Sequence, residues 1–267
     1  MEEDFSVFIS SSDEYSDLWD LFFILFQKYW PDYSGKIYLN TQEKGYSYQG
    51  LNVIATQVGR GMRFGKTFRS GLDKVYESTV LVIMIDYLFM DTVDGNKVKA
   101  LYKGFRENRL DTLRLKHHPF TAMRLVEHGF YAVDAPQDDM FSFQIAFWRK
   151  DILKKMVLAH ENPWAAEWHG TKRANVLKIR MQCVAADDEP IKYLSEGALH
   201  KGKWVAPIIS FLKRQGIVID YSKRGLFDPE KEKNLRLWER IVAKCKRSPS
   251  AFRSIMHCLW LGVRARI

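Results

Sequence analysis

Residues 80–90, VLVIMIDYLFM, form a nearly unbroken apolar run with one carboxylate, Asp86, set into it. A run this rich in Val and Ile predicts a strand buried on both faces, as in the central sheet of an α/β protein. An unpaired carboxylate inside such a core would be costly. We therefore expect Asp86 at the carboxyl edge of the sheet, where open α/β folds bind ligands. The structural alternative is an aspartate that caps a turn at the end of the strand.

Strand-like and helix-like segments alternate over roughly the first 90 residues, which predicts a doubly wound, mainly parallel sheet. We predict strands at residues 5–10, 36–40, 51–56, 80–90, 131–134 and 140–148. We predict helices at residues 18–30, 64–75, 96–109, 149–158, 163–173, 205–215 and 230–246. Residues 1–227 are interpreted as a single α/β domain, and residues 228–267 as a basic, amphipathic helical tail.

Composition narrows the class of protein. Of the 267 residues, 46% are hydrophobic, which excludes a disordered chain. The three cysteines are far apart and lack metal-ligand spacing, so a reducing compartment is expected and a zinc site is not. No run reaches the roughly 18 apolar residues of a membrane span, and the acidic start is not that of a signal peptide. We expect a cytoplasmic protein, or one that lies on a membrane surface.

The positive charge is concentrated in the tail. Residues 228–267 hold ten Lys and Arg against four Asp and Glu, which accounts for six of the nine net charges. Residues 235–245 and 255–263 combine apolar side chains, including Trp238 and Trp260, with flanking cations. Such segments bind anionic membrane surfaces; the alternative is a helix packed back on its own domain. Without a recognition motif, we expect no nucleic-acid partner.

Five segments together resemble a family of bacterial glycosyltransferase-like proteins with the GT-A fold that are encoded with surface-polysaccharide (capsule or O-antigen) genes. The segments are residues 10–41, 80–89, 141–153, 161–174 (ENPWAAEWHGTKRA) and the HKGKW at 200–204, in an order and spacing that cover roughly residues 5–205. The family usually has two adjacent aspartates before the aromatic residue. Here Ile85 takes the first position and Asp86 the second.

The resemblance implies a nucleotide-sugar donor and a divalent metal, Mn²⁺ or Mg²⁺, held at Asp86. It also implies that His200 completes the metal site and that Lys203, or its neighbour Lys201, touches phosphate. A lone histidine is more often structural, which is the alternative for His200. A single carboxylate can suffice, because these cations complete their coordination with phosphate oxygens.

The loop after the first predicted strand is where a nucleoside is expected to bind in this fold. The resemblance favours this role for Ser11, Ser12 and Asp13, although Asp13 can equally cap or turn the chain. Arg63, in the glycine-rich GRGMRFG loop, can reach a phosphate. The spacing of that loop is not that of a P-loop, so a solvated basic loop is the alternative.

An inverting glycosyl transfer needs a carboxylate to accept the proton of the acceptor hydroxyl. Glu167 and Glu161 are the candidate bases, with Glu167 preferred. Trp164 shares a helix face with Trp168 and can stack on a sugar ring. The alternative places the tryptophans in the core and Glu161 at a helix start. Gln144 is a candidate ligand of the sugar, or else satisfies backbone groups.

The sequence therefore predicts a glycosyltransferase that moves a sugar from a nucleotide sugar to a glycan, expected to be lipid-linked, at the cytoplasmic face of a membrane. One rival is a non-catalytic, membrane-associated binding or scaffold protein of the same fold, which Ile85 favours. A second is a sugar nucleotidyltransferase. That enzyme class carries a glycine-rich, basic loop after the first strand, where this chain has SSSDEYSD.

Overall fold

A mixed eight-stranded sheet forms the centre of the molecule. The computed structural model describes residues 5–117, 125–126, 129–133, 140–230 and 251–264. The strand order is β3-β2-β1-β4-β7-β5-β8-β6. Neighbouring strands are parallel from β3 to β4, whereas β7 and β6 run antiparallel to their neighbours. The bounds are β1 (Ser6–Ser10), β2 (Lys36–Leu39), β3 (Asn52–Ala55), β4 (Thr79–Met84), β5 (Thr112–Arg114), β6 (Tyr131–Ala132), β7 (Ala146–Arg149) and β8 (Met181–Cys183).

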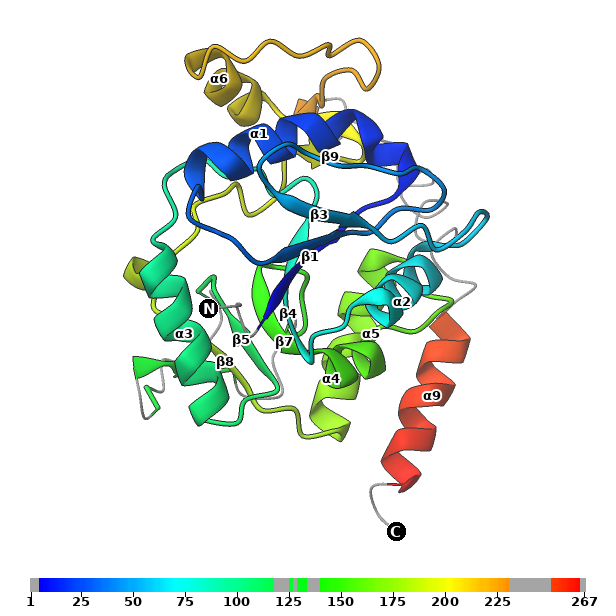
Figure 1. Ribbon diagram of the computed structural model, residues 1–267. Coiled ribbons are helices and arrows are strands. Elements are labelled where there is room, and N and C mark those ends of the chain that lie inside the picture. Colours follow the sequence, from blue (N-terminus) through cyan, green and yellow to red (C-terminus); the bar gives the residue numbers. More distant parts are fainter. Residues whose placement is uncertain (1–4, 118–124, 127–128, 134–139, 231–250, 265–267) are drawn as a thin grey trace.

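Helices cover both faces of the sheet, which confirms the predicted α/β class (Figure 1). Alternation along the strands feeds two cores: Val7 and Ile9 join the core on the side of α1 and α3, whereas Phe8 joins the core on the side of α2, α4 and α5. The helices are α1 (Trp19–Tyr29), α2 (Phe64–Lys74), α3 (Gly95–Glu107), α4 (Lys150–Met156), α5 (Pro163–Val176), α6 (Ala206–Arg214) and α9 (Ala251–Arg264).

Short elements complete the carboxyl side of the sheet. The 3-10 helix η1 (Asp13–Leu18) links β1 to α1, and a second 3-10 helix, η3 (Ala186–Asp188), follows β8. An antiparallel hairpin, β9 (Leu199–His200) and β10 (Lys203–Trp204), precedes α6.

Two predicted strands are shorter in the structure than the hydrophobic pattern suggests. The run at residues 80–90 is a strand only to Met84; beyond it the chain turns, and Phe89 stacks on Phe26 of α1 at 5.3 Å between ring centroids. The predicted strand at 140–148 is regular only from Ala146 onward. Before that point, backbone N–H groups donate to side chains, as Phe143 does to Glu167, and so leave the sheet.

The described part of the tail is a helix that packs on the domain. α9 lies along α5 (Figure 1), and its Ser254 is fully buried there. Met256, Leu259 and Trp260 stay between 48% and 59% exposed. The helix predicted at residues 230–246 lies outside the described residues, and the boundary at residue 228 stays a prediction. No helix among the described residues has the length and apolar character needed to cross a membrane.

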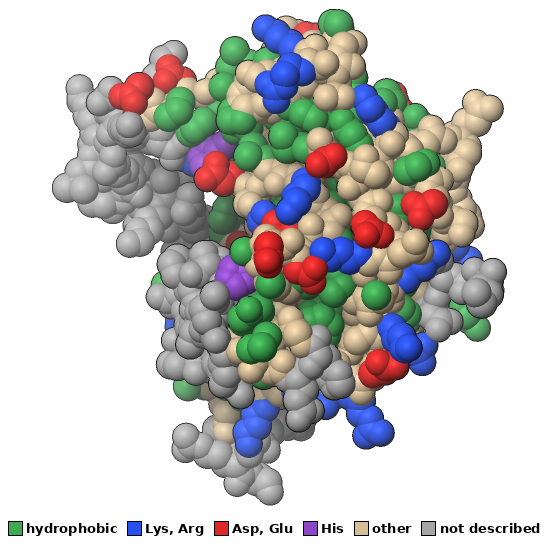
Figure 2. Space-filling model, turned by 90° about the vertical axis from the view of Figure 1, so that its left-hand side faces the viewer, with side chains coloured by type: hydrophobic (Ala, Val, Ile, Leu, Met, Phe, Trp, Pro, Cys, Tyr) green, Lys and Arg blue, Asp and Glu red, His purple; other side chains and the backbone are tan. Residues whose placement is uncertain are grey.

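Acidic and basic side chains are intermingled on the face shown in Figure 2. Ion pairs such as Lys97 with Asp188 and Lys103 with Glu107 involve the surface of α3. This face therefore carries mixed charge rather than one continuous basic surface.

Candidate active site at the carboxyl edge of the sheet

Asp86 lies at the carboxyl edge of the sheet, as the sequence predicts. β4 ends at Met84, beside the end of β1, and the chain turns at Ile85 and Asp86. The Ala198 N–H donates a 2.8 Å hydrogen bond to the Asp86 carbonyl. This bond ties the turn to the segment that leads into the β9–β10 hairpin, so two distant parts of the chain meet at Asp86.

The carboxyl group of Asp86 is enclosed by backbone. Gly197 has a φ of 83°, and a Cβ atom built there would lie 2.4 Å from Asp86 Oδ2, so this position needs glycine. Burial raises the pKa of Asp86 to about 6, although backbone hydrogen bonds and the charge of Arg224 act in the opposite direction. Such a carboxyl group exchanges its proton near neutral pH, which is typical of functional sites.

The residues predicted to hold a metal offer one well-placed oxygen ligand. His200 packs its ring 4.2 Å from that of Phe227, and the exposed Lys203 is its partner across the hairpin. Within the described residues, no three His, Cys, Asp or Glu side chains are placed to share one metal ion. Asp86 by itself fits Mg²⁺ or Mn²⁺ that also binds phosphate oxygens and water. The roles of His200 and Lys203 stay predictions.

Asp13 joins the loop after β1 to the loop after β2. Its carboxylate accepts hydrogen bonds from the backbone N–H groups of Gln42, Glu43 and Lys44, at 2.8, 2.9 and 3.1 Å. Burial acts to raise the pKa of Asp13, but these three donors and the charge of Lys44 together lower it. Asp13 therefore shapes the loop; its predicted contact with a nucleoside is untested.

The two serines before Asp13 are also fixed by local contacts. Ser11 Oγ accepts a 2.8 Å hydrogen bond from the indole N–H of Trp19, and the Ser12 carbonyl accepts one from the Tyr15 N–H at 2.9 Å. These contacts set the course of the chain into η1. The nucleoside-binding role of both serines remains a prediction.

Arg224 closes the site from the C-terminal side and was not foreseen from the sequence. It donates to both carboxylate oxygens of Asp17 at 2.6 Å, and its guanidinium lies 4.9 Å from the centre of the Tyr15 ring. Burial and the charge of Asp86 raise the pKa of Tyr15, while the charge of Arg224 acts to lower it. The segment after α6 thus reaches the loop after β1 beside Asp86.

Helix α5 presents Glu167 and two tryptophans on its accessible side. The Asn162 side chain caps the helix by accepting from Ala165 N–H at 2.8 Å. One turn later, Glu167 Oε1 accepts a 2.8 Å hydrogen bond from Phe143 N–H, which orients the half-buried carboxylate. Trp164 is 57% exposed and Trp168 59%, so these rings are not core residues.

Glu161 is enclosed in the core beneath α5. Arg173 donates to both of its oxygens, at 2.8 and 2.7 Å, and both side chains are inaccessible to solvent. Ser254 of α9 and the Leu158 N–H donate to the same carboxylate, at 2.7 and 2.9 Å. A carboxylate so enclosed cannot meet an acceptor hydroxyl. These contacts favour the structural alternative for Glu161 and leave Glu167 as the candidate base.

Gln144 is engaged with protein groups rather than open to a sugar. Its amide nitrogen donates to the Tyr87 hydroxyl at 3.1 Å and to the Ser195 carbonyl at 2.9 Å. Its amide oxygen accepts from the Tyr193 hydroxyl at 2.7 Å. Since Tyr87 follows Asp86, Gln144 holds the turn of Asp86 against the segment before the β9–β10 hairpin.

Arg63 lies on the exposed loop between β3 and α2. It is the N-cap residue of α2, and its side chain is exposed. The glycine in the first turn of this helix has a packing role, because a Cβ atom at Gly65 would lie 2.0 Å from the Leu158 carbonyl oxygen. The glycine-rich loop therefore lets α2 approach the segment before α5, and phosphate binding by Arg63 stays a prediction.

No protein-family model and no curated protein matches the sequence. Among solved structures, residues 1–349 of S. aureus TarS in complex with UDP-GlcNAc match at 13% identity and a TM-score of 0.51, over 82% of this chain and 69% of that one. The fold is GT-A-like. The same TarS fragment with UDP matches at 14% identity and a TM-score of 0.49, over 71% of this chain. This chain spans 60% of that fragment.

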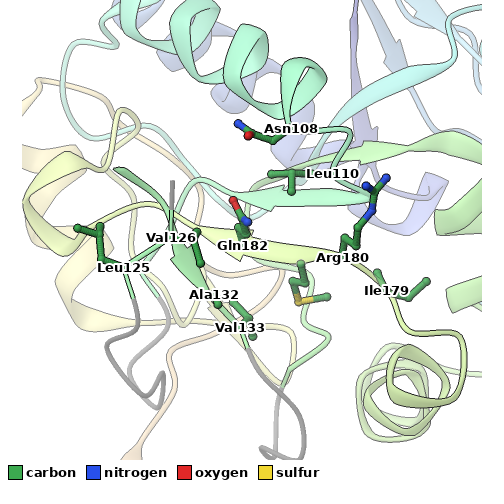
Figure 3. A pocket seen from close by; sticks show the side chains of 10 residues that line it. Asn108, Leu110, Leu125, Val126, Ala132, Val133, Ile179, Arg180 and Gln182 are labelled. Carbon is green, nitrogen blue, oxygen red and sulfur yellow. The ribbon is translucent and has the colours of Figure 1, made fainter. Parts of the chain in front are cut away.

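A cavity of about 650 Å³ lies at the opposite, amino edge of the sheet (Figure 3). Its lining includes Asn108 and Leu110 before β5, and Ile179 and Arg180 before β8. None of the residues predicted to bind substrate or metal lines it. The cavity is therefore separate from the candidate active site.

Proposed function

We propose that the chain is a GT-A-type glycosyltransferase that moves a sugar from a nucleotide-sugar donor to a glycan acceptor. The observation that carries the proposal is the half-buried Asp86 carboxyl at the carboxyl edge of this sheet, next to the loop after β1. Ligands of open α/β sheets bind at that edge. The similarity in fold to TarS, which was crystallised with UDP-GlcNAc, supports the same placement.

The donor would lie between the loop after β1 and the turn at Asp86. Asp13 holds the loops after β1 and β2 together, and the nucleoside would rest against Ser11 and Ser12. Asp86 would bind Mg²⁺ or Mn²⁺, which when present neutralises charge on the diphosphate. Lys203 and Arg63 are exposed cations that would add to this neutralisation.

Glu167 would serve as the general base for the acceptor hydroxyl. The hydrogen bond from Phe143 N–H fixes one oxygen of this half-buried carboxylate and would orient the group toward an incoming hydroxyl. The exposed rings of Trp164 and Trp168 beside it offer a surface on which a sugar ring can stack. The protein would thus orient the acceptor and accept its proton at one site.

Transfer with Glu167→Gln tests the role of the base. We expect turnover to fall by about 10²- to 10⁴-fold while donor affinity is unchanged, because only proton transfer is removed. Glu107→Gln on α3, which is distant from the site, is the matched control and should keep wild-type turnover. Retained turnover in Glu167→Gln would reject this carboxylate as the base.

We also propose that α9 rests on an anionic membrane at its cytoplasmic face, where a lipid-linked acceptor would be found. The supporting observation is that Met256, Leu259 and Trp260 are exposed beside the exposed cation Arg253, although α9 is packed on α5. Trp260→Glu should abolish co-sedimentation with vesicles that contain anionic lipid. Tyr76→Glu, which alters an 87%-exposed ring on another surface, should not.

A non-catalytic protein of the same fold is the second candidate. Ile85, at 3% exposure, fills the position of the first aspartate with a core side chain, and the described residues contain no group of three His, Cys, Asp or Glu side chains that could hold a metal ion. Such a protein would bind a nucleotide without consuming it. A sugar nucleotidyltransferase would instead release pyrophosphate from a nucleoside triphosphate and a sugar phosphate. The products of a turnover assay therefore distinguish the glycosyltransferase, the non-catalytic protein and the nucleotidyltransferase.

A further inference from the structure

One arginine, Arg114, reaches the carboxyl edge of the sheet beside the candidate base. It is the last residue of β5 and pairs with Ala146 of β7 and Cys183 of β8. The preceding Leu113 points into the core on the side of α1 and α3, so alternation turns Arg114 toward the face that α5 covers. Arg114 and Glu167 therefore approach the same place, one from the sheet and one from the helix.

Protein groups satisfy the Arg114 guanidinium only in part. Nη1 donates a 3.1 Å hydrogen bond to Ser142 Oγ, whereas the buried Nε has no hydrogen-bond partner. Within the described parts of the chain, the guanidinium forms no ion pair. A guanidinium carries five N–H donors and stays charged in proteins, so a buried donor without an acceptor is costly unless a ligand supplies one.

The groups around Arg114 belong to the candidate site. Burial lowers the pKa of Arg114, and the groups that act in the opposite direction include Tyr193, Tyr87 and Glu167. The rings of Tyr87 and Tyr193 lie 4.7 Å apart, and both hydroxyls are hydrogen-bonded to Gln144. The phenols are therefore already engaged with Gln144. Glu167 acts on Arg114 through its charge, and the buried Nε donor keeps no hydrogen-bond partner among the described residues.

We propose that Arg114 holds an oxyanion, a phosphate or carboxylate group, that a substrate brings to this edge of the sheet. The planar fork of an arginine suits both groups, because each offers two oxygens to parallel N–H donors. This inference rests on the proposed function, because it assigns the anion to a substrate of the same site.

The oxyanion has two sources, the diphosphate of the donor and a charged group on the acceptor. β7 lies between β5 and β4, so Arg114 stands two strand spacings, roughly 10 Å, from β4, the strand that leads into the turn at Asp86. That separation, and the position of Arg114 beside Glu167, favour the acceptor as the source. Arg114 then selects acceptors that carry a phosphate or an acidic sugar near the reacting hydroxyl.

Calorimetric titration of the full chain with inorganic phosphate tests the anion site. Wild type should bind phosphate, and Arg114→Met should lose at least tenfold in affinity. Arg149→Met is the matched control, since Arg149 is on the adjacent strand β7 and pairs with Asp111 at the other edge. Equal phosphate affinity in Arg114→Met and wild type, or no binding to wild type, would overturn the proposal. Arg114→Lys keeps the charge but not the planar fork of donors, so its phosphate affinity should fall several-fold. If Arg114→Met fails to fold, the phosphate affinity of Arg114→Lys tests the proposal instead.

Titration with UDP separates the two sources. We expect Arg114→Met to bind UDP within twofold of wild type, as an acceptor-side anion requires. A parallel loss of UDP and phosphate affinity would support the oxyanion site but overturn its assignment to the acceptor.

The two proposals can fail separately. Phosphate binding that depends on Arg114, in a protein that neither binds nor consumes nucleotide sugars, would reject the proposed function and leave an anion site. Turnover that is unaffected in Arg114→Met, together with unchanged phosphate affinity, would reject the inference and leave the proposed function intact.

Discussion

The close approach of Gly197 to the carboxyl group of Asp86 is the contact on which the candidate donor site depends. Gly197→Ala places a Cβ atom 2.4 Å from Asp86 Oδ2 at a φ of 83°. Gly202→Ala is a matched control, because Gly202 has a φ of 79° and a Cβ atom there would meet nothing within 4 Å. Each substitution should cost about 1–2 kcal/mol of backbone strain. Only Gly197→Ala should also weaken donor binding, which titration with nucleotide sugars measures; equal binding in both variants would contradict the assigned contact.

The raised pKa of Asp86 predicts a pH-dependent cost to stability without metal. Burial raises the pKa from 3.8 to about 6, so the folded state holds the proton more tightly than the unfolded state. The stabilisation that protonated Asp86 gives to the folded state is complete below about pH 4 and is lost as the pH rises through about 6. Asp86→Asn should therefore gain stability over wild type at pH 8 but not at pH 4, by urea unfolding in EDTA.

The control for this pH dependence is Asp187→Asn, which alters an exposed aspartate. It should shift stability by the same small amount at both values of pH. If the difference in stability between Asp86→Asn and wild type is the same at pH 4 and pH 8, the assignment of a raised pKa to the Asp86 carboxyl is wrong.

Asp86 could be placed from the sequence, whereas Glu161 could not, for a physical reason. The apolar run fixes where a strand must end, and a carboxylate there is forced to an edge. The environment of Glu161 depends instead on Arg173, 12 residues away, and on Ser254, 93 residues away. Local pattern identifies a helix start near Glu161, but such distant partners leave no local signal. Arg114 was missed for the same reason, although a cation between Leu113 and Leu115 was a visible irregularity.

The buried ion pair of Glu161 and Arg173 joins α5 to the segment before it, and Ser254 of α9 donates to the same carboxylate. Glu161→Gln leaves a buried guanidinium without its charge partner, so we expect a loss of about 3–5 kcal/mol in the free energy of unfolding. Glu43→Gln is the control, since its pair with Arg60 is on the surface and should change stability by less than about 1 kcal/mol. Chemical denaturation measures both, and similar effects would contradict the structural role of Glu161.

Helices and strands could be predicted from the sequence where the apolar pattern is long. Their prediction failed where the pattern is short or interrupted. The strands β1 to β4 and helices α1 to α5 follow the predicted order. Their ends differ by at most three residues, except that β4 ends at Met84, six residues before the predicted end. β5 and β8 have three residues each and too little pattern to be recognised. The long strand predicted at 140–148 is shortened because Glu167 and the Tyr193 hydroxyl accept from Phe143 and Ile145 N–H groups.

Across the molecule, a doubly wound sheet brings distant segments to one edge. The loop after β1, the turn after β4, the segment before β7 and the end of β5 all meet there. This arrangement gathers the proposed metal ligand, the candidate base and an arginine with an unpartnered Nε donor from positions 86, 167 and 114. It is the topology, rather than any single motif, that assembles the candidate site.

The most direct test of a donor site at Asp86 is thermal unfolding of the full chain with a panel of nucleoside diphosphates and nucleotide sugars, each with and without Mn²⁺. We expect that one nucleotide raises the unfolding temperature in a manner that needs Mn²⁺, and that Asp86→Asn abolishes the rise. An unfolding temperature that no nucleotide changes, or a rise that survives in Asp86→Asn, would contradict a donor site built on Asp86.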